Sequence, residues 1–99
     1  MELENALASV LRMKRTQLNF TQEELAHLCN LDRTYISLLE RSKRKPTLST
    51  LFKICDILSI TPGEFIYEIE TIWLLTIMGS LKWRLIRKIY GVFLIKLNH

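Results

Sequence analysis

The sequence predicts an all-α protein: five short helices joined by short connections, with an additional helical tail at the C-terminus. Three observations support this fold class. Apolar residues recur at the three- and four-residue spacing of amphipathic helices, and no segment shows the strict alternation of a half-buried strand. Residues that start and stop helices recur at short intervals along the chain. Apolar residues make up 48% of the 99 residues, enough for one modest core.

The first predicted helix spans Leu3–Leu18 and groups its basic residues at the C-terminal end, where they suit the helix dipole. The second helix has a clear start, because Thr21 and Glu24 form a capping box. Asn30 tolerates the left-handed conformation of a tight turn, so this helix should end near Cys29 or Asn30. We expect its buried face to comprise Leu25, Ala26 and Cys29.

A third helix is predicted over Arg33–Glu40, because Asp32 is a good N-cap for it. Ile36 and Leu39 lie three residues apart and should face the core. The residues that then project from another face are Arg33, Thr34 and Ser37. A basic loop over residues 42–45 follows, and the proline after it ends any helical continuation.

The fourth helix is predicted over Leu48–Leu58, with Thr47 or Ser49 as its N-cap. Its apolar stripe comprises Leu51, Ile54, Cys55 and Leu58. The fifth helix opens with Thr61-Pro62-Gly63-Glu64, which supplies a cap, a proline at the first helical position and an acid. We expect the buried face of this helix to start with Phe65 and Ile66.

Charge divides the chain into a domain of residues 1–70 and an extension of residues 71–99. The domain carries nine Lys or Arg against ten Asp or Glu, whereas the extension carries five bases and no acid. Within the domain, bases cluster at Arg12–Arg15 and Arg41–Lys45. Such local patches attract nucleic acid even when the domain as a whole is near neutral.

The extension combines apolar and basic residues. Its apolar run Ile72–Leu81 is too short to span a bilayer. From Leu81 onward, apolar and basic residues separate onto two sides at helical spacing. We expect a helix that packs on the core or across a dimer. The alternatives are a helix on a membrane surface, which we favour less, and a segment without a fixed structure.

Nothing in the sequence indicates catalysis or metal binding. Cys29 and Cys55 lie outside any Cys/His cluster and in apolar helical patterns, so we expect buried thiols and a reducing compartment, the cytoplasm. His27 and His99 have no partners at metal-ligand spacing and are expected at the surface. No paired carboxylates, nucleophile–base set or phosphate loop is visible, so we expect neither an enzyme nor a cofactor. The first residues lack the basic start of a signal peptide.

Several segments keep a recognisable spacing: Phe20-Thr21-Gln22-Glu23-Glu24-Leu25-Ala26, Leu31-Asp32-Arg33-Thr34-Tyr35-Ile36-Ser37, Leu39-Glu40-Arg41 and Pro46-Thr47-Leu48. Over about residues 5–68, this pattern resembles the Xre-type, phage-repressor-like helix-turn-helix family. Among its branches, the chain looks most like the controller proteins of restriction–modification systems. The resemblance implies a five-helix phage-repressor-like fold and a transcription regulator that binds a palindromic operator in double-stranded DNA as a homodimer. An antitoxin with a toxin partner and a prophage repressor are the alternatives, and the toxin would then bind the extension.

The resemblance makes the third helix the recognition helix, whose N-terminal residues reach base edges in the major groove. The candidate base contacts are Arg33, Thr34 and Ser37, with Arg33 expected to make a bidentate contact to guanine O6 and N7. The candidate contacts to the DNA backbone are Gln22, Tyr35, Lys43, Arg44 and Thr47. Backbone contacts of this kind position a protein without specifying sequence.

Two further expectations follow from the resemblance. Arg15 and Glu40 should form a structural ion pair between the first and third helices. The dimer interface is expected at the fifth helix and the extension, through Phe65, Ile66 and Ile69. Many family members have glycine in the turn before the third helix and after its Glu-Arg pair. Asn30 and Ser42 stand there in this chain, and the serine predicts a different exit from the third helix.

Overall fold

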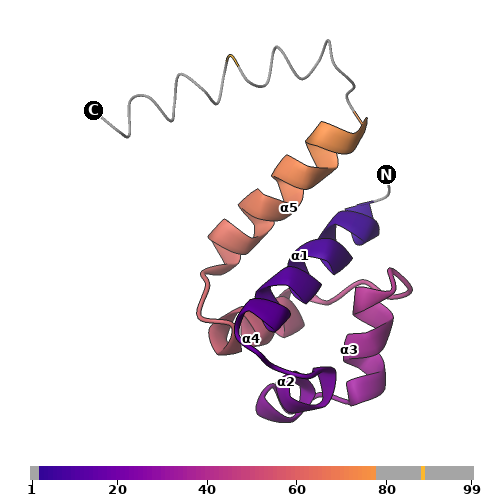
Figure 1. Ribbon diagram of the computed structural model, residues 1–99, viewed down its shortest axis with the longest axis vertical. Helices are drawn as coiled ribbons and strands as arrows, with labels where there is room; N and C mark the ends of the chain where they lie inside the picture. The colour runs from indigo at the N-terminus through magenta and orange to yellow at the C-terminus, as the bar shows by residue number, and fades with distance from the viewer. Residues whose placement is uncertain (1–2, 78–87, 89–99) are drawn as a thin grey trace.

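The computed structural model describes residues 3–77 and residue 88. Its helices are α1 (Leu3–Gln17), α2 (Gln22–Leu28), α3 (Arg33–Glu40), α4 (Leu48–Ile57) and α5 (Pro62–Ile77), arranged as in Figure 1. No strand occurs among these residues, which confirms the predicted all-α class and its five helices. Residues 78–87 and 89–99 lie outside the described residues, and with them most of the expected helical extension.

Side chains cap the starts of the short helices. The backbone nitrogen of Glu24 donates to Thr21 Oγ1, and the backbone nitrogen of Thr21 donates to the Glu24 carboxylate, each at 3.0 Å. These bonds complete the predicted capping box and lower the pKa of Glu24, the bond from the Thr21 backbone contributing most. Asp32 caps α3 as predicted, and Thr47 rather than Ser49 caps α4. The helix starts are therefore set by local chemistry.

Four helices end on a non-glycine residue in the left-handed conformation. These residues are Asn19, Asn30, Ser42 and Ser59, with φ angles of 61°, 56°, 62° and 57°. After each of them the chain closes the last turn, as when the Lys43 nitrogen donates to the Leu38 carbonyl at 2.8 Å. Asn30 thus behaves as predicted. The exit expected to differ at Ser42 does not, because this serine adopts the conformation that a glycine would supply.

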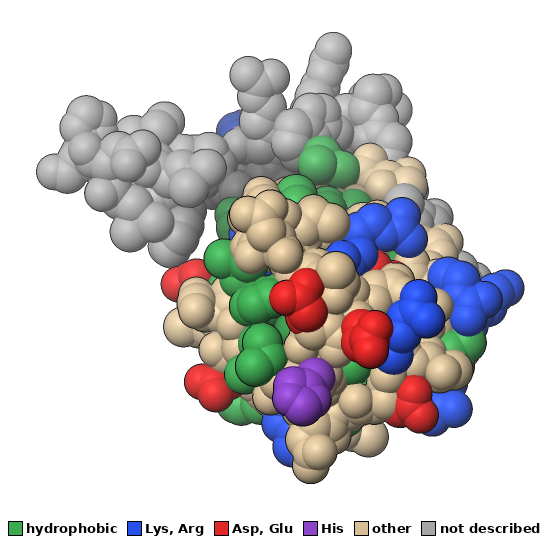
Figure 2. Space-filling view, turned by 60° about the horizontal axis from the view of Figure 1, so that its bottom comes forward, with side chains coloured by type: hydrophobic (Ala, Val, Ile, Leu, Met, Phe, Trp, Pro, Cys, Tyr) green, Lys and Arg blue, Asp and Glu red, His purple; other side chains and the backbone are tan. Residues whose placement is uncertain are grey.

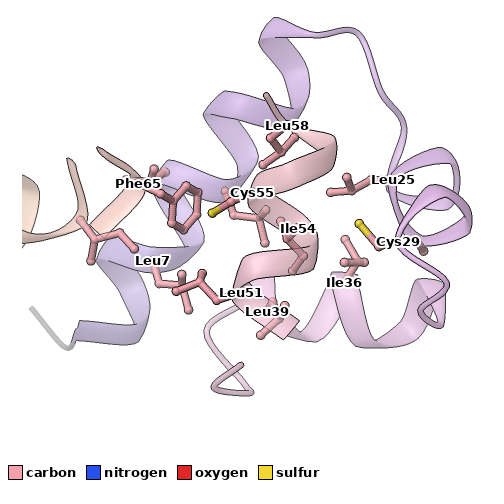
Figure 3. Close-up of a cluster of buried hydrophobic side chains, with 14 of the residues drawn as sticks. Leu7, Leu25, Cys29, Ile36, Leu39, Leu51, Ile54, Cys55, Leu58 and Phe65 are labelled. Atoms are coloured by element: carbon pink, nitrogen blue, oxygen red, sulfur yellow. The ribbon is translucent and has the colours of Figure 1, made fainter. Parts of the chain in front are cut away.

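The buried side chains of all five helices meet in one core (Figure 3), in which α1 packs against α3 and α5, α2 against α3, and α4 against α2 and α5. The residues predicted to face it from α2, α3 and α4 are all buried: Leu25, Ala26, Cys29, Ile36, Leu39, Leu51, Ile54, Cys55 and Leu58. Both thiols lie there as expected, and burial raises the pKa of Cys55 to about 11.

The last described helix, α5, lies beside α1 (Figure 1) and continues to Ile77, so it crosses residue 70, where the charge pattern placed the domain boundary. Its inward face carries Phe65 and Ile69, four residues apart, whereas Ile66 is 45% exposed. The prediction that Ile66 faces the core was wrong, because adjacent helical residues point about 100° apart. An ion pair between Lys14 Nζ and Glu68 Oε1, at 3.0 Å, also joins the two helices.

Candidate nucleic-acid interface

Helix α3 has one face in the core and one face in solvent. Ile36 and Leu39 are buried, as predicted. On the outer face, a shallow hollow is lined by Arg33, Thr34, Ser37 and Arg41. Figure 2 shows basic side chains gathered on the right of the molecule, the side on which α3 lies in Figure 1. The structure thus brings the three candidate base-contact residues together on an accessible surface.

Arg41 is a member of this surface that the sequence analysis did not single out as a site residue. Its Nε donates to the Ser37 hydroxyl oxygen at 3.2 Å and to the Ser37 carbonyl oxygen at 3.4 Å. The signal was present in the sequence, because residues four apart on a helix are neighbours on its surface.

Three of the candidate backbone-contact residues, Lys43, Arg44 and Thr47, follow the C-terminal end of α3, whereas Tyr35 lies within α3 and Gln22 starts α2. Lys43 and Arg44 are exposed. The Arg44 guanidinium lies 5.6 Å from the centre of the Tyr35 ring, an arrangement that cation–π attraction favours. Tyr35 and Arg44, expected as separate contacts, therefore form one unit. The Thr47 hydroxyl accepts a hydrogen bond from the Thr50 nitrogen and donates its hydrogen to the Thr50 hydroxyl, so in this structure that hydrogen does not face a phosphate.

The basic loop is also tied to the start of α1. Lys45 Nζ lies 3.1 Å from Glu4 Oε1, although the lysine side chain remains mostly exposed. A shallow hollow between the two segments is lined by Glu4, Asn5, Ser42, Lys43, Arg44 and Lys45. This ion pair holds one end of the loop near α1, and Lys43 and Arg44 precede it along the chain.

The ion pair between Arg15 and Glu40 is present. Arg15 Nε and Nη2 donate to the two Glu40 carboxylate oxygens at 2.6 and 2.9 Å, and Nη1 donates to the Phe20 carbonyl at 2.8 Å. The Glu40 side chain has no accessible surface and that of Arg15 is 13% exposed. The hydrogen bond to Glu40 raises the pKa of Arg15, which keeps its charge fixed.

Two more side chains bind Glu40 that the sequence did not indicate. Gln22 Nε2 donates to Glu40 Oε1 at 3.1 Å, and Arg12 Nη2 donates to the Glu40 carbonyl oxygen at 2.9 Å. One glutamate at the end of α3 therefore joins α1, α2 and α3. The Gln22 amide has two hydrogens, so one of them remains for the expected phosphate contact.

The residues expected at a dimer interface differ in their accessibility. Phe65 is fully buried in the core of its own chain. Ile69 is also buried, whereas Ile66 is exposed. Among the three, Ile66 is the residue that can contact a partner directly.

Within residues 3–77 and at residue 88, no cluster of three or more histidine, cysteine or acidic side chains could hold a metal ion. His27 is exposed, as expected. No helix in this part of the chain is long and apolar enough to cross a membrane.

A capped recognition helix with a basic outer face, joined to the preceding helix by a tight turn, defines the class of helix-turn-helix DNA-binding proteins. The family described as Helix-turn-helix matches residues 11–65. The chain belongs to this family.

Comparison with individual proteins points to one branch of the family. The control protein C.SmaI of Serratia marcescens is 41% identical over 59 residues, which make up 60% of this chain and 70% of that protein. A hypothetical transcription factor of Neisseria meningitidis is 39% identical over 65 residues, or 66% of this chain. The match spans only 61% of that relative's length.

Comparison with solved structures points to the same branch of the family. The restriction–modification controller protein C.Esp1396I, crystallised as a tetramer with its natural 35 base-pair operator, is 34% identical with a TM-score of 0.65. The match covers 72% of this chain and 93% of that chain. The predicted resemblance to controller proteins is thus confirmed, and the antitoxin and prophage-repressor alternatives are not favoured.

Proposed function

We propose that this chain is a sequence-specific transcription regulator of the controller type, which binds a palindromic operator in double-stranded DNA as a homodimer. The observation that carries the proposal is the outer face of α3, where Arg33, Thr34 and Ser37 lie together above a buried apolar face. An α-helix fits the major groove, where each base pair shows a distinct pattern of donors and acceptors. C.Esp1396I, a similar protein, has been crystallised on its operator, which supports the same kind of ligand here.

Within this proposal, α3 supplies the sequence-specific contacts. Arg33 stands at the first position of the helix, where its guanidinium can bind guanine O6 and N7 together. Thr34 follows with a methyl group for thymine and a hydroxyl for a base edge. Ser37 lies one turn further along the same face.

Groups around α3 would hold the DNA backbone. Lys43 and Arg44 follow its C-terminal end, Arg44 lies over the ring of Tyr35 on α3, and Gln22 lies at the start of α2. Gln22 is held by Glu40, so a phosphate bound to its second amide hydrogen would be coupled to the Arg15–Glu40 ion pair. These contacts would set the depth and angle of α3 in the groove.

A homodimer is proposed because one helix-turn-helix spans only a few base pairs, and two-fold symmetric proteins match palindromic sites. Ile66 is an apolar side chain that α5 leaves exposed, with Ile69 on the next turn beneath it. A second copy packed against this part of α5 would bury Ile66 and bring two recognition helices onto one face of the DNA.

The test begins with a library of random double-stranded DNA, from which the wild-type protein selects its operator. We expect Arg33→Ala to bind that operator about 10- to 100-fold more weakly and to lose its preference at one guanine. Titration of labelled duplexes measures both effects. Lys43→Ala is the matched control, because loss of a phosphate contact should weaken binding to every sequence about equally. Equal affinity and unchanged preference in Arg33→Ala would contradict the proposed recognition surface.

A further inference from the structure

The Ser37 hydroxyl bonds differently from three threonine hydroxyls on α1 and α5. Thr16, Thr71 and Thr76 each donate to the carbonyl oxygen four residues earlier, at 2.9, 2.9 and 2.8 Å. Ser37 instead accepts a hydrogen bond from Arg41 Nε at 3.2 Å. Its own proton is donated to no protein acceptor in the part of the chain that the structure describes. That proton is therefore available on the outer face of α3.

The hydrogen bond from Arg41 decides whether the Ser37 hydroxyl donates to a ligand or accepts from it. A serine hydroxyl has one hydrogen to donate and two lone pairs to accept with, whereas a guanidinium can only donate. Arg41 thus occupies one lone pair of Ser37. The other lone pair lies beside a positive charge, which opposes the approach of a second donor. What Ser37 offers to a ligand is its hydrogen.

The position of Arg33 strengthens this effect. Arg33, Ser37 and Arg41 recur every fourth residue along one face of α3, and all three line the same hollow. A helix rises 1.5 Å per residue, so the two arginines stand about 12 Å apart along its axis with the serine between them. A donor group that approaches Ser37 therefore approaches two positive charges as well.

We propose that Arg41 is a specificity-determining residue that acts by positioning Ser37 as a hydrogen-bond donor to a base. The proposal rests on the function given above, because it requires the outer face of α3 to lie in the major groove. There, guanine offers N7 and O6, adenine N7 and thymine O4 as acceptors, whereas cytosine presents only its N4 donor. The base that faces Ser37 is therefore one with an acceptor edge, and cytosine is excluded.

The experiment uses duplexes in which each position of the selected operator is replaced by the other three bases. For the wild-type protein, one position should disfavour cytosine roughly five- to tenfold relative to the best base, as one lost hydrogen bond implies. In Arg41→Ala that preference should fall below about twofold. The preferences at all other positions should be unchanged.

Ser37→Ala identifies the operator position that the serine contacts. This variant should weaken the base preference at the same operator position as Arg41→Ala does. The double variant should weaken that preference no further, because the two residues act as one unit. Lys43→Ala removes an equal charge from the neighbouring loop and should leave every base preference intact. Circular dichroism checks that each variant is folded.

The outcomes separate the two proposals. If Arg41→Ala keeps the exclusion of cytosine, or relaxes a different position from Ser37→Ala, the role of Arg41 is wrong. In that case the proposed function still stands, provided that Arg33→Ala loses its guanine preference. If the wild-type protein selects no sequence from the library, the proposed function itself fails.

Discussion

The carboxylate of Glu40 has no accessible surface, yet it receives hydrogen bonds from Arg15 on α1 and from Gln22 on α2. A buried carboxylate is tolerated only when it is paired and hydrogen-bonded, because otherwise the loss of hydration is not recovered. Since Glu40 ends α3, these bonds fix α3 relative to the two helices before it. The residue thus supports the proposed DNA-binding surface without being exposed on it.

The two arginines on Glu40 allow a matched test of this role. Arg15→Ala should lower the free energy of unfolding by about 3–5 kcal/mol, because it leaves the buried carboxylate without its main partner. Arg12→Ala should cost less than about 1 kcal/mol, because the Arg12 side chain is 59% exposed and its ion pair with Glu40 is 3.7 Å long. Urea denaturation followed by circular dichroism measures both. Similar losses in the two variants would show that burial does not set the value of these contacts.

Sequence reasoning reached part of this site. The Arg15–Glu40 pair was available from the family resemblance, but the bonds from Gln22 and Arg12 were not. They depend on how three helices pack, which no local pattern reveals. The Arg41–Ser37 bond was within reach, since it joins residues four apart on one helix.

At the scale of the helices, the residue at which a helix begins was easier to predict than the side of the helix that is buried. Caps such as Thr21 and Asp32 act on residues two or three positions ahead, so a short stretch of sequence contains the whole interaction. The face of α5 depends on its packing against α1, and there Phe65 was assigned correctly and Ile66 was not. No sequence signal marked the end of α5, and the change in charge at residue 70 does not interrupt the helix.

The left-handed residues that follow four of the helices are not glycines, and this gives a prediction for the free energy of unfolding. A serine at φ 57° carries a steric cost that glycine does not. We therefore expect Ser59→Gly, at the end of α4, to raise the free energy of unfolding by about 0.5–1 kcal/mol.

The control for this change is Ser9→Gly on the exposed side of α1, where the helical conformation suits serine. There glycine should lower the free energy of unfolding by a few tenths of a kcal/mol, about 0.5 at most. Chemical denaturation measures the two changes. A loss of stability in Ser59→Gly would mean that its side chain contributes more than its conformation costs.

At the scale of the whole molecule, the proposed assembly depends on a surface that one chain cannot reveal by itself. We expect the wild-type protein to be a dimer at micromolar concentration and Ile66→Lys to shift it toward monomer, because a charge would replace an exposed apolar side chain of α5. Sedimentation equilibrium without DNA measures this change. Leu28→Lys is the control, since it charges an equally exposed leucine on α2 and should leave the dimer intact. Dimers of equal strength in both variants would place the interface elsewhere.

Helix α3 keeps the residues that hold it in the core separate from the residues proposed to read DNA. Ile36 and Leu39 hold the helix in place from within, while the hollow lined by Arg33, Thr34, Ser37 and Arg41 is open to solvent. Because the two sets of residues do not overlap, new outer residues can be transplanted from a related regulator without repacking the interior. Under the proposed function, we therefore expect the target sequence to change through substitutions at these four surface positions, while the core that holds the helix stays the same.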